Sequence, residues 1–407
     1  METEMTLSEN GLELVPSPEI QSRIEKFQEW MASEELEGAF ILQNVDIYYF
    51  SGTLQRSILF VPVSGKALLM VVKSFQRALN ETPLEKVLSI SGRDGIFPLL
   101  AEFNHGSLRR VGLEMDVLPT AQYLWFRKKL PQTEFIDVSP GIRNLRMIKS
   151  LYEAEQIKRA TAILGKGYQE IQGLIREGMT ELEIDGLLSW ISRREGHMGV
   201  MRMRGWNQEM TYAHVLSGEG GASISCCETP VSGTGNSPAM PQGAGFRRVC
   251  RNEPIYIDYG VAVNGYHSDQ TRTFVIGELD KKLARAHDCA REILEKLEAE
   301  IMPGFPCDEV FEMAKDIACS RGFEENFMGH GEGKVKFLGH GIGLEIDELP
   351  IMAPIFRAPV QEGMVFALEP KFIFPGLGTV GIEDDYLVTS RGLERITFME
   401  QEVICIP

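Results

Sequence analysis

The sequence lacks long apolar runs. No stretch approaches the ~20 consecutive apolar residues that a membrane-spanning helix needs. The first residues, METEMTLSENGLELVPSPE, are acidic and do not contain the apolar segment of a signal peptide. We therefore expect a cytoplasmic protein.

Basic residues and paired cysteines are also scarce. Against 58 Asp and Glu there are only 41 Lys and Arg, which gives a formal net charge of -17. This charge disfavours nucleic acid or an anionic membrane as a partner, because both would be repelled. The 7 cysteines are odd in number and form no C-x-x-C pair, so we expect reduced thiols, the adjacent Cys226 and Cys227 included.

What the sequence does contain is enough chain for two domains, since it has 407 residues. In the first part, Ser17-Pro18 opens a helix, and a second helix-like segment is TAQYLWFRKKL. Strands are predicted at 38–42, 57–63, 67–72, 111–115 and 135–139. This alternation predicts an α/β domain over 1–145, with a boundary near 140–150 and a second domain over 146–407.

The second part shows the order helix pair, then strands, twice. Capping-box spacings at Ser150 and Thr180 begin the first two long helices. Asp280 caps a third helix, and a fourth follows at 307–320. Residues 200–250 are rich in Gly, Ser and Pro, and strands dominate after 337. This order suggests two related halves.

A predicted hairpin carries two aspartates. Asn264-Gly265 is a favoured two-residue turn. A turn centred there places Asp258 opposite Thr271 and makes Asp269 its diagonal neighbour on the same face, ~7–8 Å away. Two carboxylates on one sheet face repel each other unless a cation or proton lies between them. The hairpin therefore predicts half of a metal site.

Three further residues complete a possible ligand set. His340 lies between glycines in GHGIG, Glu369 lies in FALEPKF, and Glu383 begins an apolar segment in GIEDDYLVT. Buried glutamates need partners, and a shared metal supplies one for both. Four carboxylates and an imidazole suit one or two divalent ions such as Mn, Fe, Co or Zn.

These motifs, in this order, resemble the M24 family, the pita-bread metallopeptidases related to creatinase, aminopeptidase P and prolidase. The resemblance covers essentially the whole chain and implies a creatinase-type N-terminal domain, a pita-bread catalytic domain with pseudo-repeated halves, and a homodimer. It implies two divalent ions: one at Asp258, the other at His340 and Glu369, with Asp269 and Glu383 bridging them. The residue matching Glu369 also assists the water.

The chain departs from the family around these residues. Where proline-directed members usually carry histidines, it has Gln242 in AMPQG, Lys336, and Asp347 in IDE; several members also have an arginine where this chain has Gly381. An amide cannot act as a general acid or base, whereas Asp347 can act as a base or bind a cationic group.

Other residues near these motifs are weaker candidates. His214 and Asp347 are candidates for both catalysis and substrate binding, and Gln242 is a candidate for substrate binding only. We expect His267 and His330 to be structural or exposed rather than catalytic. Tyr212 and Arg204 are further candidates to face the cleft.

Three functions remain open. The first is a metal-dependent hydrolase of the Xaa-Pro peptidase type, with Glu369 as proton carrier and a small peptide as substrate. The second is a non-peptidase reaction on the same scaffold, either creatinase-like C–N hydrolysis or dimethylsulfoniopropionate-lyase-like chemistry, with Asp347 as base or cation-binding group. The third is a non-enzymatic binding protein, which retention of all five ligands disfavours.

Overall fold

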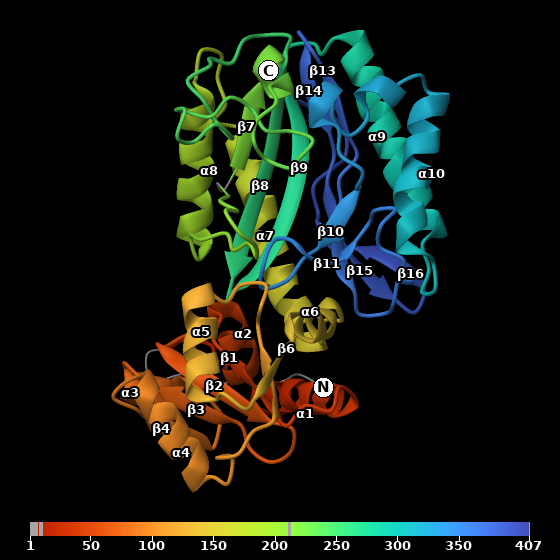
Figure 1. Ribbon diagram of the computed structural model, residues 1–407. Helices are drawn as coiled ribbons and strands as arrows, with labels where there is room; N and C mark the ends of the chain where they lie inside the picture. Colours follow the sequence, from red (N-terminus) through yellow and green to blue (C-terminus); the bar gives the residue numbers. More distant parts are fainter. Residues whose placement is uncertain (1–6, 8–10, 211–212, 407) are drawn as a thin grey trace. The chain divides into compact units, whose positions relative to one another are not determined.

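The chain folds into two compact units of mixed α/β structure. The computed structural model describes residues 7, 11–210 and 213–406 (Figure 1). One unit comprises Met1–Arg146 together with Arg204–Asn207, and the other Met147–Met203 together with Gln208–Pro407. The short segment Arg204–Asn207 is separated in sequence from the rest of its unit, which composition alone did not indicate.

The first unit is built on one six-stranded sheet of order β4-β3-β2-β1-β5-β6. Its strands are β1 (Gly38–Ile41), β2 (Ser57–Pro62), β3 (Leu68–Val71), β4 (Lys86–Ser89), β5 (Arg110–Leu113) and β6 (Glu134–Asp137). Its helices are α1 (Ser17–Ser33), α2 (Asn44–Ser51), α3 (Phe75–Glu81), α4 (Ile96–Glu102), α5 (Thr120–Lys129) and α6 (Ser139–Met147). All five predicted strands and both predicted helices of this region are present.

Buried ion pairs join loops and helices within this unit. Arg204 contacts Asp46 at 2.7 Å and Asp116 at 2.6 Å, and Arg146 contacts Asp46 at 2.7 Å. Asp46 is fully buried, so its charge requires these two guanidinium groups. Arg204 is thus committed to carboxylates of the first unit.

The second unit begins with the helix pair α7 (Leu151–Ile171) and α8 (Glu181–Glu195), and both predicted capping boxes are present. The helices are followed by a sheet of order β17-β9-β8-β7. Its strands are β7 (Ala213–Ser217), β8 (Pro254–Val263), β9 (Tyr266–Ile276) and β17 (Ile404–Ile406). Helix α7 contacts both β8 and β9, so the helices cover one face of this sheet (Figure 1).

The second half of this unit repeats that order. Helices α9 (Lys281–Glu300), capped by Asp280, and α10 (Cys307–Ser320) precede a sheet of order β11-β10-β12-β15-β16 and the pair β13-β14. The strands are β10 (Gly339–Gly341), β11 (Glu348–Ile351), β12 (Val365–Leu368), β13 (Lys371–Phe374), β14 (Gly378–Gly381), β15 (Asp384–Thr389) and β16 (Gly392–Arg395). The arrangement of two helix-pair-and-sheet halves agrees with the sequence pattern.

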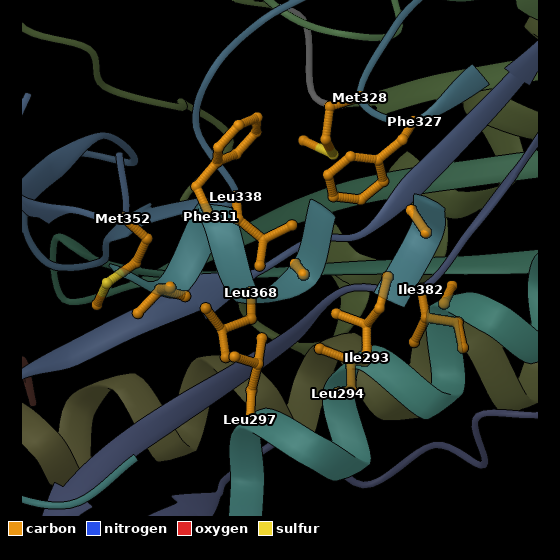
Figure 2. Close-up of a cluster of buried hydrophobic side chains, with 14 of the residues drawn as sticks. Ile293, Leu294, Leu297, Phe311, Phe327, Met328, Leu338, Met352, Leu368 and Ile382 are labelled. Carbon is orange, nitrogen blue, oxygen red and sulfur yellow. The ribbon is translucent and has the colours of Figure 1, made fainter. Parts of the chain in front are cut away.

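The core of this second half is aliphatic and aromatic. Figure 2 shows Ile293, Leu294 and Leu297 of α9 packed toward Leu368 and Ile382, all of them buried. Burying such side chains stabilises the fold by about 1.5–3 kcal/mol each. This core fixes the sheet edges that carry the polar residues described below.

No helix among the described residues is long and apolar enough to cross a membrane. The described chain includes every cysteine, and all seven are free thiols, with 4.0 Å between the sulfur atoms of Cys226 and Cys227.

Candidate metal centre

The β8–β9 hairpin places its two aspartates as the sequence predicts. Asn264 and Gly265 form the turn with positive φ angles of 49° and 92°. Asp258 pairs with Thr271, and Asp269 pairs with Gly260, so the two aspartates are diagonal neighbours on one face. Both are buried, with relative exposures of 7% and 4%.

His340 lies in the short strand β10, between β11 and β12. A Cβ atom on Gly339 would lie 2.0 Å from the carbonyl oxygen of Ala367, and one on Gly341 would lie 2.1 Å from that of Leu349. Only glycine fits at either position, because the obstacle is backbone. The two glycines thus let the neighbouring strands close around His340.

The two glutamates lie at strand ends. Glu369 directly follows β12, and Glu383 directly precedes β15. The backbones of Glu383 and Thr271 exchange two hydrogen bonds, of 3.2 and 3.3 Å, which join β9 of the first half to the second half. This bridge brings Glu383 beside the hairpin aspartates, so the predicted ligands from both halves meet in one place.

On one side of this cluster the groups are spaced as ligands of a single ion. His340 Nε2 lies 3.7 Å from Glu369 Oε1 and 3.9 Å from Glu383 Oε1. Ligand atoms of Asp269, His340 and Glu383 all lie within 4.8 Å of one another. Two ligands each ~2.0–2.2 Å from a metal lie at most about 4.4 Å apart, so this spacing is close to that of a metal site. Glu383 Oε1 is buried and has no hydrogen-bond partner among the described residues, as an atom reserved for a cation would be.

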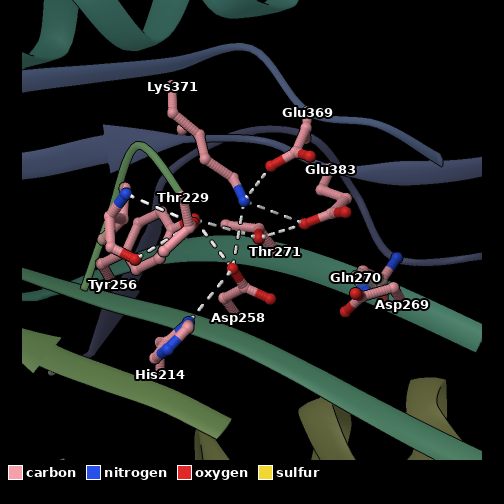
Figure 3. Close-up of polar contacts among 12 residues, drawn as sticks. His214, Thr229, Tyr256, Asp258, Asp269, Gln270, Thr271, Glu369, Lys371 and Glu383 are labelled. Carbon is pink, nitrogen blue, oxygen red and sulfur yellow. Dashed lines mark hydrogen bonds and ion pairs between the residues drawn. The ribbon is translucent and has the colours of Figure 1, made fainter. Parts of the chain in front are cut away.

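On the other side of the cluster lies a lysine. Figure 3 shows the Lys371 ammonium among Asp258, Glu369 and Glu383. Its Nζ lies 3.1 Å from Asp258 Oδ2 and 3.3 Å from Glu383 Oε2, and its contact with Glu369 Oε2 is the shortest of the three. The structure thus brings together all five predicted ligands, and it adds a cation that the sequence reading did not assign to the site.

The electrostatics differ between the two sides. Burial raises the pKa of Asp269, and the charges of Glu383 and Asp258 raise it further. Burial also raises the pKa of Glu383, to about 8, although Lys371 opposes this. For Asp258, burial acts to raise the pKa, but the charges of Lys371 and His214 outweigh it and lower the pKa. Negative charge is therefore compensated at Asp258, only partly compensated at Glu383, whose Oε2 contacts Lys371 while its Oε1 has no hydrogen-bond partner among the described residues, and least compensated at Asp269, so a metal cation would be favoured beside Asp269 and Glu383 Oε1.

His340 is held by a carboxylate behind it. Its Nδ1 lies 3.2 Å from Asp347 Oδ1, while its Nε2 faces the glutamates. Burial lowers the pKa of His340, but the charges of Asp347 and Glu369 outweigh burial and raise it to about 9. A carboxylate at one imidazole nitrogen leaves the other free to bind a metal.

His214 and Gln242, the other predicted substrate-binding residues, lie in different environments from each other. His214 on β7 pairs with Asp258 in register, and its Nδ1 lies 3.9 Å from Asp258 Oδ2. Its Nε2 has no hydrogen-bond partner among the described residues. Gln242 instead donates to the Glu209 carbonyl oxygen and accepts from the Cys227 thiol, both at 2.7 Å.

His267 and His330, which the sequence predicts to be structural or exposed, contact backbone groups. His267 is buried between the Arg202 backbone N–H and the Gly343 carbonyl oxygen, and burial lowers its pKa to about 4. His330 contacts the Ala222 carbonyl oxygen at 2.9 Å. Tyr212 lies outside the described residues.

Lys371 is the residue that the sequence reading missed. The sequence contains one indication of its role: Lys371 directly follows the Glu369-Pro370 pair and is followed by the apolar run FIF. A lysine in a buried strand requires an anionic partner. The nearby Glu369 was the obvious candidate.

Comparison with protein families identifies both parts of the chain. Residues 155–390 match the model of metallopeptidase family M24, and residues 23–148 match the creatinase/prolidase N-terminal domain. The first match contains all five predicted ligands.

Individual relatives match over nearly the full length. An Xaa-Pro dipeptidase of Pyrococcus furiosus is 28% identical over 95% of this chain and 100% of that protein. Among solved structures, the prolidase of Pyrococcus horikoshii has a TM-score of 0.79 at 26% identity, covering 94% of this chain and 100% of that one. An Xaa-Pro dipeptidase from Bacillus anthracis has a TM-score of 0.80 at 25% identity, with coverages of 95% and 99%.

The matches explain the architecture and the ligand set together. The fold is a creatinase-like N-terminal domain followed by a pita-bread domain, as the sequence motifs implied. M24 metallopeptidases use two divalent metal ions, and the spacing of the donor atoms of Asp269, His340 and Glu383 is close to that needed for one of them. The model match spans more than half of the sequence, and the chain therefore belongs to metallopeptidase family M24.

Proposed function

We propose that this protein is a metal-dependent hydrolase that cleaves short peptides at an Xaa-Pro bond. The observation that carries the proposal is the meeting of Asp269, His340 and Glu383 in one buried group of ligand atoms within 4.8 Å. Relatives described as Xaa-Pro dipeptidases match almost all of the chain, which supports this substrate class.

A bound divalent ion would polarise a carbonyl group and lower the pKa of a water molecule, so that hydroxide is available near neutral pH. The proposed ligands are the five that the sequence indicated, Asp258, Asp269, His340, Glu369 and Glu383. These five residues are not equally available to a metal ion, because the Asp258 carboxylate already forms an ion pair with Lys371. The ion itself would be Mn, Co, Fe or Zn, since oxygen and imidazole donors suit all four.

The protein's own groups would orient the substrate and move protons. Glu369 Oε1 faces His340 and would accept a proton from water and deliver it to the leaving amine. His214 has an unpartnered Nε2 and would contact the substrate. Asp347 would keep His340 in the tautomer with its proton on Nδ1, and its half-exposed side chain leaves it available to a cationic substrate group.

Gln242 would contribute through its loop. Both ends of its amide are occupied by Glu209 and Cys227, so it would hold the segments around these two residues together and shape the substrate pocket rather than carry protons.

We further propose that the two domains comprise 1–145 and 146–407, and that the protein is a cytoplasmic homodimer without nucleic-acid or membrane partners. The net charge of -17 supports the absence of nucleic-acid and membrane partners, and the free thiols support a cytoplasmic location. Light scattering coupled to size-exclusion chromatography measures the oligomeric state directly.

The experiment that tests the function is a peptide panel. Metal-free protein is reconstituted separately with Mn²⁺, Co²⁺, Fe²⁺ and Zn²⁺ and incubated with Ala-Pro, Ala-Pro-Ala, Ala-Ala and Pro-Ala. We expect cleavage of the first two peptides alone and none by the Asp269→Ala variant. An intact panel combined with turnover of small cationic acids or amides would instead support the non-peptidase alternative.

A further inference from the structure

Lys371 is built into the metal centre by strand pairing. It is the first residue of β13 and pairs directly with Gly381 of β14. A Cβ atom at Gly381 would lie 2.9 Å from Lys371 Cγ, so the missing side chain provides the room through which the lysine reaches the site. The Lys371 side chain is only 3% exposed. Its position is therefore set by the fold.

The ammonium group is fully engaged. An ammonium has three N–H donors, and Lys371 Nζ has three carboxylate partners, in Asp258, Glu369 and Glu383. The Asp258 and Glu383 oxygens that it contacts also accept hydrogen bonds from hydroxyl groups. Tyr256 Oη donates to Asp258 Oδ2 at 3.2 Å, and Thr271 Oγ1 donates to Glu383 Oε2 at 2.7 Å. These oxygens are occupied without a metal.

The two glutamates divide their oxygens between two positions. In both Glu369 and Glu383, Oε2 contacts Lys371, whereas Oε1 faces His340 Nε2. For Glu383, which the family resemblance implies is a bridging ligand, this is how a carboxylate that bridges two metal ions divides its oxygens. The ammonium lies at one of the two bridged positions, and the other position, beside His340, faces the unpartnered Glu383 Oε1.

Charge counting is compatible with this division but does not by itself choose between one ion and two, because both leave one unit of net charge. The four carboxylates of the ligand set carry four negative charges, which two divalent ions alone would neutralise. With the Lys371 ammonium present, two ions would leave these buried groups with a net positive charge, whereas one ion leaves a single negative charge. A second ion would also have to break three buried ion pairs and leave the ammonium uncompensated, which is strongly unfavourable.

We propose that the Lys371 ammonium takes the place of one of the two divalent ions used by this family. The centre then binds a single ion, beside His340, Asp269 and Glu383. The position assigned to the lysine is the one beside Asp258. The inference rests on the proposed function for the ligand set, and it changes the cofactor of that function from a metal pair to one metal and one fixed organic cation.

Metal counting on the full-length protein tests this inference. Metal-free protein is titrated calorimetrically with Mn²⁺, dialysed, and analysed for bound metal by mass spectrometry. We expect one ion per chain for the wild type and two for Lys371→Met, which keeps the length of the side chain and removes its charge. Electron paramagnetic resonance gives an independent reading, because an isolated Mn²⁺ ion has a six-line spectrum and a coupled pair does not.

A matched control removes another buried lysine from the same unit. Lys149 pairs with Glu348 at 3.0 Å, and its side chain is 1% exposed. The Lys149→Met variant loses a buried ion pair to Glu348 on β11, next to Asp347, but leaves the Lys371 ammonium in place, so we expect it to bind one ion, as the wild type does. Two ions in the wild type, or equal counts for wild type and Lys371→Met, would overturn the inference.

A second pair of variants does not depend on the folding of Lys371→Met. If Asp258 contacts the lysine rather than the ion, Asp258→Asn retains the ion about as tightly as the wild type. Removing a ligand in His340→Ala weakens binding at least about 100-fold, more than the loss of an outer partner does. Equal weakening in both variants would refute the one-ion arrangement.

These outcomes are separate from the proposed function. Failure of the peptide panel with one ion per chain would remove the Xaa-Pro substrate and leave the lysine assignment in place. Peptide cleavage by a two-ion wild-type enzyme would do the reverse.

Discussion

The contact between Asp347 and His340 gives a prediction whose size can be worked out. Replacing Asp347 by alanine removes the carboxylate that lies 3.2 Å from His340 Nδ1. The imidazole then loses the partner that fixes its tautomer and orientation. Loss of such an outer partner weakens metal binding about 10- to 100-fold, or about 1.4–2.7 kcal/mol. Because Asp347 is 46% exposed and solvent screens its charge, we expect the lower end of this range.

A second effect has the opposite sign and depends on pH. The pKa of His340 in the metal-free protein is raised to about 9, so at neutral pH a proton competes with the metal. Removing Asp347 lowers this pKa and weakens the competition. In the wild type, metal affinity therefore rises as pH rises toward about 9, whereas in Asp347→Ala it levels off at a lower pH. The net loss of affinity grows with pH.

The assay is a competition titration of Zn²⁺ against a fluorescent chelator between pH 6.5 and 8.5. Glu312→Gln is the control, because Glu312 is a similarly exposed carboxylate that pairs with Lys315 at 3.7 Å on α10, outside the ligand set. We expect Asp347→Asn to lose less affinity than Asp347→Ala, since an amide oxygen still accepts a hydrogen bond. Unchanged affinity of Asp347→Ala at pH 8.5, or an equal loss in Glu312→Gln, would refute the orienting role.

Three other perturbations have defined outcomes. Gly341→Ala places a Cβ atom 2.1 Å from the Leu349 carbonyl oxygen, so it should displace β10 and weaken metal binding, measured by the same titration. Burial and the charges of Arg272 and Arg291 lower the pKa of His287 to about 3, below its ordinary 6.5, so stability falls as pH decreases through this window. In urea unfolding, the free energy of unfolding of His287→Leu should fall less steeply than that of the wild type as pH decreases from 6.5 to about 3. The two slopes should differ by up to ~1.4 kcal/mol per pH unit. Leu297→Ala in the core of Figure 2 should destabilise by about 2–5 kcal/mol in the same assay, with metal affinity unchanged.

Local patterns predicted much of the fold and most of the centre. The Asn264-Gly265 turn fixed the register of β8 and β9, and therefore the relation of Asp258 to Asp269, before any tertiary contact was known. Capping boxes located the starts of α7 and α8 in the same way. Such features depend on a few neighbouring residues, which is why the sequence alone revealed them.

The features that the sequence did not reveal depend on pairing between distant segments. The direction of the Lys371 side chain depends on β14 and on the absence of a side chain at Gly381. Both ends of Gln242 are taken by loop residues that no spacing rule connects. The contact of Asp347 with His340 depends on the pairing of β10 with β11. Each of these is a property of packing, and none has a periodic pattern in the sequence.

The grouping of Arg204–Asn207 with the first unit affects how that unit can be isolated. A fragment ending at Arg146 would lack the guanidinium that contacts both Asp46 and Asp116. It would keep the fully buried Asp46 with one cation in place of two, an imbalance that a buried carboxylate tolerates poorly. Although residues 1–146 look like an independent module in the sequence, an expressed fragment of them should be less stable than the same residues in the full chain, because Asp46 and Asp116 lose the Arg204 guanidinium.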